Sequence, residues 1–264
     1  MEPVWGLDHD DHYPPPHLRP VVIGVDIGKK VDHTAFAVAE LDHGQSEDEP
    51  RFLIRDFAQL PLGIPYPVIG DKLIAAIAAI RTRDVGLMRQ YLMDRDGYRG
   101  ANERSAERRA ITVRIDASGV GEPVVDAIRR PLRELDVRVE ALMFVTGERL
   151  TDKGATWSMG KAYLVSRLMV VFENGRVQID ADHPLRDGII KEAADYQVRI
   201  ERAGRAKYGA MESGTHDDMI TALGLAVLKD SRRPTPAATL EDIERVLMGD
   251  YYDYASDDPW GSEW

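Results

Sequence analysis

The feature that most constrains this sequence is the apolar run at residues 21–28, VVIGVDIG. Four apolar residues and a glycine lead up to Asp26, and a short apolar run of this kind is typical of a buried β-strand. A single aspartate near a strand end is most simply a turn or capping residue. It becomes a candidate metal ligand where other carboxylates meet it from elsewhere in the chain.

Two further stretches bring carboxylates that can join Asp26. Asp116 ends a predicted strand (ITVRID), and Asp217 and Asp218 open an apolar helix. Taken alone, Asp116 would form an Asx-type turn, and Asp217 and Asp218 would cap the helix. Taken together, these residues predict one metal site, in which His216 is a loop or outer-shell residue rather than a direct ligand.

The order of predicted elements indicates an α/β fold with a mixed central β-sheet flanked by helices. Three strands come first, and helices and strands alternate after them. Strands are predicted at 21–28, 34–39, 51–57, 111–116, 137–145 and 177–179, with a hairpin at 196–201 and 207–212. Helices are predicted at 72–83, 87–93, 123–133, 161–172, 184–195, 218–229 and 240–248, with an exposed loop at 95–109 and a loop at 146–157.

The net charge of −11 is concentrated at the two ends of the chain. Counting charged side chains, residues 1–20 carry −3 and residues 236–264 carry −7, so the remainder is near neutral. A near-neutral body can still present a local basic groove, and the acidity therefore does not exclude a nucleic acid partner. We expect an extended arm at 1–19, one domain at 20–232, and an acidic, aromatic tail at 233–264 for docking a partner or self-screening.

The chain contains no cysteine, which excludes disulfides and thiolate metal sites. Its first twenty residues do not read as a signal peptide, because they lack a basic start and an apolar core. No apolar run approaches the roughly 20 residues that cross a bilayer. We expect no membrane association and a cytoplasmic location, in the host cell cytoplasm if the protein is viral.

Clustered carboxylates favour a hard, oxygen-loving cation such as Mg²⁺ or Mn²⁺. Two such ions about 4 Å apart can activate a water and stabilise the leaving oxygen of a phosphodiester. Without a cation, the same carboxylates repel one another. The acids therefore predict metal-dependent hydrolysis of phosphodiester bonds.

Three stretches, VVIGVDIGKKVDHTAFAV, VRIDASGVGEPVVDAI and GTHDDMITALGLAV, resemble the nuclease domain of phage large terminases. The resemblance covers about residues 20–230 and implies an RNase H-like fold, close to the RuvC resolvases. It implies that Asp26, Asp116 and Asp218 are the catalytic and metal-binding acids, with Asp217 as the second choice for the third position. It also implies an endonuclease that cuts concatemeric double-stranded DNA during packaging, using two Mg²⁺ or Mn²⁺ ions. An ATPase motor, a small terminase and a portal protein are the implied partners.

Four lysines are candidate DNA contacts. Lys29 and Lys30 directly follow the strand that carries Asp26, and Lys153 and Lys161 lie before and at the start of a predicted helix. The alternative for each is an ordinary surface lysine.

The sequence departs from the family pattern at two points. The GxxxxGK[ST] phosphate loop of a terminase ATPase motor does not occur, so we expect a stand-alone nuclease or a domain of a longer protein. Thr221 stands where RuvC-type enzymes place a fourth acid. Three alternatives remain: a Holliday-junction resolvase or transposase-like nuclease of the same fold, a sugar-kinase or actin-like ATPase, and a non-catalytic packaging or assembly subunit. The ATPase would need a second lobe, and a binding subunit has no use for mutually repelling acids.

Helical spacing favours Asp218 over Asp217 as the third ligand. In RuvC-like proteins this acid stands four residues before an alanine of the last helix, and Asp218 and Ala222 have that spacing on one helical face. Asp217 then falls at the helix cap, where its side chain is expected to accept a backbone N–H bond.

Overall fold

The computed structural model describes residues 19–28, 32–42, 50–94, 110–145, 151–152, 156–200, 206–210 and 217–228. Within them, eight strands form one sheet in the order β6-β7-β5-β4-β1-β2-β3-β8, and β9 pairs with β10 in a separate hairpin. The strands are β1 Val21–Asp26, β2 Ala35–Asp42, β3 Arg51–Gln59, β4 Ile111–Asp116, β5 Arg138–Phe144, β6 Thr151–Asp152, β7 Thr156–Met159, β8 Val177–Ile179, β9 Tyr196–Ile200 and β10 Ala206–Ala210.

The sheet is mixed, as predicted. β1 pairs antiparallel with β2, and β2 pairs antiparallel with β3. On its other side β1 pairs in parallel with β4, and β4 pairs in parallel with β5. Parallel neighbours need crossover connections, which helices supply. The helices are α1 Tyr66–Asp94, α3 Glu122–Arg133, α4 Lys161–Glu173, α5 Arg186–Asp195 and α6 Asp218–Val227.

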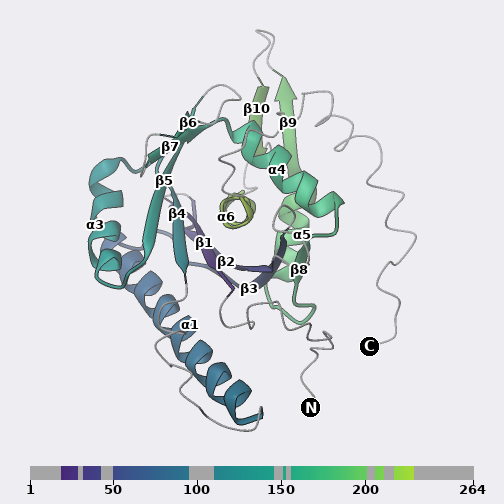
Figure 1. Ribbon diagram of the computed structural model, residues 1–264. Coiled ribbons are helices and arrows are strands. Elements are labelled where there is room, and N and C mark those ends of the chain that lie inside the picture. The colour runs from purple at the N-terminus through teal and green to yellow at the C-terminus, as the bar shows by residue number, and fades with distance from the viewer. Residues whose placement is uncertain are drawn as a thin grey trace.

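Helices cover both faces of the sheet (Figure 1). α1 and α3 pack on one face, in a core that includes Val21, Ile23, Val25, Leu73, Ile77, Val113, Ile115, Ile128 and Leu132. α4, α5 and α6 lie on the other face, and the sheet curves around α6, which Figure 1 shows end-on. Every residue of α6 from Asp218 to Val227 is buried, which explains why the helix is apolar almost all round.

A glycine and several alanines let α6 approach the sheet closely. A Cβ atom on Gly24 of β1 would stand 2.0 Å from the backbone oxygen of Ala222 and 2.6 Å from the backbone nitrogen of Ala226. No residue larger than glycine fits such a crossing without moving the helix. β2 contributes three buried alanines to the same core, Ala35, Ala37 and Ala39.

The end of α6 is held by a buried arginine of β4. Arg114 donates hydrogen bonds to the carbonyl oxygens of Leu225, at 3.3 Å, and Leu228. Its charge is paired with the buried carboxylate of Glu140 on β5 at 2.9 Å, which in turn pairs with Arg138. Because the last carbonyls of a helix have no partner within it, Arg114 satisfies groups that would otherwise be buried unpaired.

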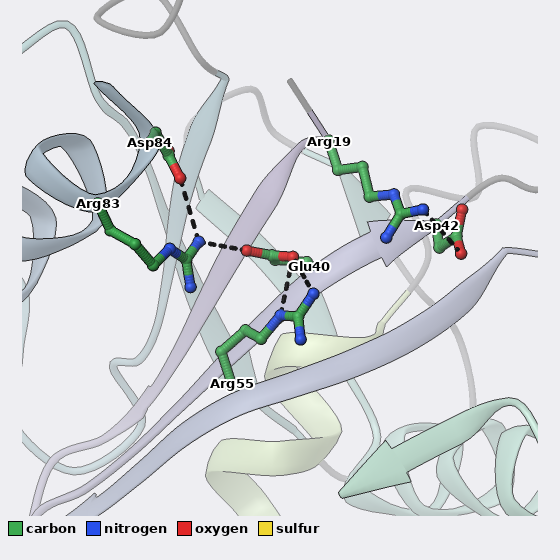
Figure 2. A network of polar contacts seen from close by, with 6 residues as sticks. All are labelled: Arg19, Glu40, Asp42, Arg55, Arg83 and Asp84. Atoms are coloured by element: carbon green, nitrogen blue, oxygen red, sulfur yellow. Dashed lines mark hydrogen bonds and ion pairs between the residues drawn. The ribbon is translucent and has the colours of Figure 1, made fainter. Parts of the chain in front are cut away.

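A second charged network ties α1 to the sheet, at the end where β1 begins (Figure 2). Glu40 of β2 is buried and accepts hydrogen bonds from Arg55 of β3, at 2.8 Å, and from Arg83 of α1. Arg83 also pairs with the buried Asp84 at 3.1 Å. These contacts offset the cost of burying two carboxylates.

Within the described residues, the predicted elements are confirmed with two differences. The helices expected at 72–83 and 87–93 form one helix, α1, which also begins earlier, at Tyr66. Arg83 and Asp84, where the first helix was expected to end, take part in the network around Glu40. The loop expected at 146–157 contains β6 and the first two residues of β7. β7 has four residues and pairs in parallel with β5, a contact that so short a run cannot signal.

Several predictions lie outside the described residues, namely all but the last residue of the arm at 1–19, the arginine-rich loop at 95–109, the helix at 240–248 and the tail at 233–264. The predicted domain limits therefore stay predictions. In the described part of the chain, no helix is long and apolar enough to cross a membrane.

Candidate metal centre

The strand register brings Asp26 and Asp116 side by side. β1 and β4 are parallel, and their last paired residues are Val25 and Ile115. Asp26 and Asp116 come next in each strand, at the same edge of the sheet. Val25 and Ile115 belong to the core under α1 and α3. Because side chains alternate along a strand, the two carboxylates point to the opposite face, which carries α6.

The start of α6 supplies two more carboxylates. Asp217 is the residue before the helix, and Asp218 is its first residue. Asp218 is 4% exposed, and its Oδ2 accepts a hydrogen bond from the backbone N–H of His33 at 3.1 Å. His33 lies in the connection that follows Asp26, so the start of α6 is tied to the end of β1.

Asp217 does not cap the helix as predicted. It occupies the N-cap position, but its side chain makes no capping hydrogen bond. Its Oδ2 instead accepts a hydrogen bond from Nζ of Lys161, the first residue of α4, at 2.6 Å. The predicted hydrogen bond is wrong because spacing along one helix identifies the cap position but not a cation on another helix.

Asp116 is oriented by the turn that follows β4. Its Oδ1 accepts from the backbone N–H of Ser118 at 2.8 Å, and the Ser118 side chain also hydrogen-bonds to it. The Ser118 Oγ accepts from the backbone N–H of Phe144 at 2.6 Å, which links the turn to β5. The Asx-type turn and a place in the site are thus compatible. Ser118 is absent from the predicted site, although a serine two residues after a strand-end aspartate is a signal for it.

The pKa values of Asp26 and Asp116 are raised by burial and by the charges of neighbouring carboxylates. Burial, and then the charge of Asp116, raise the pKa of Asp26 well above its ordinary value, and the two aspartates of α6 add to this effect. Burial also raises the pKa of Asp116, against the hydrogen bonds from Ser118 that lower it. The charge of Lys161 lowers the pKa of both aspartates. The group of acids therefore favours added positive charge, and Lys161 supplies part of it.

A divalent cation fits this group in chemistry and charge. Carboxylate oxygens are the ligands that Mg²⁺ and Mn²⁺ prefer. As the side chains stand, however, no three His, Asp or Glu residues in the described ranges are arranged to hold a metal ion. Asp116 bonds to its own turn, Asp217 to a lysine and Asp218 to a backbone amide. These aspartates would exchange partners on binding a cation.

Four other predicted site residues, Lys29, Lys30, Lys153 and His216, lie outside the described residues. Lys161 lies at the site, and its contact with DNA stays a prediction.

No family model and no curated protein matches the chain. It is similar to solved structures of terminase nucleases. The large terminase nuclease from thermophilic phage G20c, with bound magnesium, is 22% identical, with 79% of this chain and 80% of that chain covered and a TM-score of 0.48. The human cytomegalovirus terminase nuclease domain, soaked with manganese, is 12% identical, with coverage of 83% and 88% and a TM-score of 0.48. The large terminase nuclease domain from bacteriophage SPP1, with bound manganese, is 14% identical, with coverage of 79% and 85% and a TM-score of 0.42.

At these identities and TM-scores, the likeness assigns no activity to this chain. The topology itself is RNase H-like, since an antiparallel β3-β2-β1 unit continues into parallel β4 and β5 with helices on both faces. The fold class predicted from the sequence is confirmed.

Proposed function

We propose that this chain is a divalent-metal-dependent endonuclease that hydrolyses phosphodiester bonds of double-stranded DNA. The observation that carries the proposal is the parallel register that sets Asp26 beside Asp116, within electrostatic reach of Asp217 and Asp218. A binding module gains nothing from carboxylates placed where they raise the pKa of Asp26, whereas a cation-dependent hydrolase needs them together.

When bound, Mg²⁺ or Mn²⁺ would lower the pKa of the attacking water and neutralise charge on the leaving oxygen. The chain's contribution is to hold the oxygen ligands on rigid elements. Asp26 and Asp116 stand at the ends of central strands, and Asp218 stands at the start of a buried helix. Lys161 balances part of their charge without a cation, and it would be able to reach a DNA phosphate if a cation took its place.

From the family resemblance, we extend the proposal to the cutting of concatemeric phage DNA during packaging. It then includes two metal ions, an ATPase motor, a small terminase and a portal protein as partners, and a cytoplasmic location. The magnesium and manganese in the similar terminase structures agree with the ligand chemistry, but the proposal rests on the residues of this chain.

Plasmid cleavage by the purified chain tests the proposal. We expect nicking and linearisation with Mn²⁺ or Mg²⁺, and none with EDTA or with Ca²⁺ alone, whose coordination is longer and looser. ATP should not be required. Equal cleavage in EDTA, or an absolute need for ATP, would refute the proposal.

Substitutions of the acids locate the activity. Asp26→Asn, Asp116→Asn and Asp218→Asn should each lower cleavage more than about 100-fold, beyond the loss typical of an outer-shell change. Asp71→Asn, at an exposed position of α1, is the matched control and should cleave normally. A folded chain that binds Mn²⁺ without cutting would favour the non-catalytic subunit. Strong preference for four-way junctions would favour the resolvase.

A further inference from the structure

The first turn of α6 is capped by a residue from another helix. The first N–H groups of a helix have no partner within it, and an N-cap side chain usually accepts from one of them. In α6 the side chain at the N-cap, Asp217, bonds to Lys161. Glu192 of α5 accepts in its place, with its Oε1 2.9 Å from the backbone nitrogen of Ile220.

Capping α6 with Glu192 costs free energy, because a carboxyl group must be buried to do so. Glu192 is 8% exposed, and burial raises its pKa to about 7, against the hydrogen bond from Ile220 that lowers it. The charges of Asp218 and Asp217 raise the pKa further. A serine or asparagine at the start of α6 would cap the helix without burying a carboxyl group. Glu192 differs from an ordinary cap because its hydrogen bond to Ile220 holds the turn that carries Asp218.

The surroundings of this turn leave Asp218 little freedom. A Cβ atom on Gly188, one turn before Glu192, would stand 3.4 Å from Cε of Met219, so α5 packs directly on the first turn of α6. Met219 and Ile220 are the two residues after Asp218. On its other side, the Asp218 carboxylate is held by a backbone N–H of the β1–β2 connection.

We propose that Glu192 is a positioning residue of the candidate metal centre, capping α6 from α5 and thereby fixing the direction of the Asp218 carboxylate. The inference rests on the proposed metal-binding role of Asp218. Neither the sequence motifs nor the family resemblance indicates Glu192, because it lies 26 residues before Asp218 on a separate helix.

The test compares Glu192→Gln with Glu192→Ala in the full chain. Glutamine keeps an oxygen that can accept from Ile220, and alanine removes it. Asp187→Ala is the matched control, because it removes a carboxylate that is 97% exposed on the same helix. Two quantities are measured: the Mn²⁺ dissociation constant by titration calorimetry, and hydrogen exchange of the Met219 and Ile220 amides by NMR without metal.

We expect Glu192→Ala to weaken Mn²⁺ binding by roughly 10- to 100-fold, the range for residues that orient metal ligands, and to speed exchange of the Ile220 amide. Glu192→Gln should lose less than about tenfold, and Asp187→Ala should match the wild type. Rescue by glutamine shows that position, rather than charge, is what Glu192 supplies. Equal losses in both variants, or normal Mn²⁺ affinity in Glu192→Ala, would overturn the inference.

Failure of the proposed function is distinguishable from failure of this inference. A wild-type chain that binds no Mn²⁺ refutes the metal centre, while amide exchange still reports on the cap. Unchanged exchange in Glu192→Ala overturns the cap whatever the metal does. If Glu192→Ala does not fold, Glu192→Asp, whose shorter side chain withdraws the acceptor, takes its place beside Glu192→Gln.

Discussion

The crossing of α6 over β1 at Gly24 allows a quantitative prediction. A Cβ at this position would lie 2.0 Å from the backbone oxygen of Ala222, and real Cβ atoms essentially never come closer than 3.0 Å to such a neighbour. Gly24→Ala therefore requires α6 to move by about 1 Å. Overpacking costs roughly 1–3 kcal/mol, occasionally more. Because the obstacle is backbone of a fully buried helix, we expect a loss of about 3 kcal/mol or more.

The same shift acts on the candidate site, because α6 begins with Asp218. Misplacement of a reacting group by 1 Å can cost on the order of 100-fold in rate. We therefore expect Gly24→Ala to lose cleavage even where the protein remains folded, as judged by its far-ultraviolet circular dichroism.

Urea unfolding followed by circular dichroism measures the loss in stability. Gly86→Ala is the matched control, since Gly86 is exposed in α1 and a Cβ there meets nothing within 4 Å. This variant should gain roughly 0.5–1 kcal/mol, because alanine loses less conformational entropy in a helix. A Gly24→Ala protein as stable as the wild type would refute the close crossing.

Three further predictions concern charge. In EDTA, Asp26→Asn should raise the Tm at pH 7 and not near pH 4. The pKa of Asp26 is higher in the folded than in the unfolded state, so its carboxyl group makes the fold less stable as the pH rises above about 4. An equal gain at both pH values would contradict this reasoning. Lys161→Met should lower the Tm without metal and enlarge the rise in Tm that Mn²⁺ causes. A Tm unchanged by the substitution in both conditions would show that Lys161 does not balance the charge of the acids. Arg114→Met removes the buried partner of Glu140, together with the donor to the carbonyls of Leu225 and Leu228, and should cost about 3 kcal/mol or more in urea unfolding. Arg138→Met, which removes a half-exposed partner of the same carboxylate, should cost about 1 kcal/mol or less, and equal losses would be incompatible with this account.

The sequence by itself determined most of the described elements of this protein, with β6 and β7 as exceptions, and its candidate acids. Buried residues recur with a period of 2 in a strand and 3.6 in a helix, so the longer segments could be identified without knowledge of their neighbours. The apolar runs before Asp26 and Asp116 and the helix after Asp218 were identified in this way. The order of these elements was enough to predict a mixed α/β sheet.

The tertiary structure alone decided which partner each polar group has. Asp217 stands at the N-cap position that the sequence predicts, yet its carboxylate bonds to Lys161, 56 residues away. Glu192 accepts the capping hydrogen bond instead, and the sequence around Glu192 in α5 does not indicate this role. Asp26 and Asp116 meet through a strand register that neither strand encodes alone. The physical reason is that such contacts depend on where distant elements cross, and local periodicity of burial carries no information about crossings.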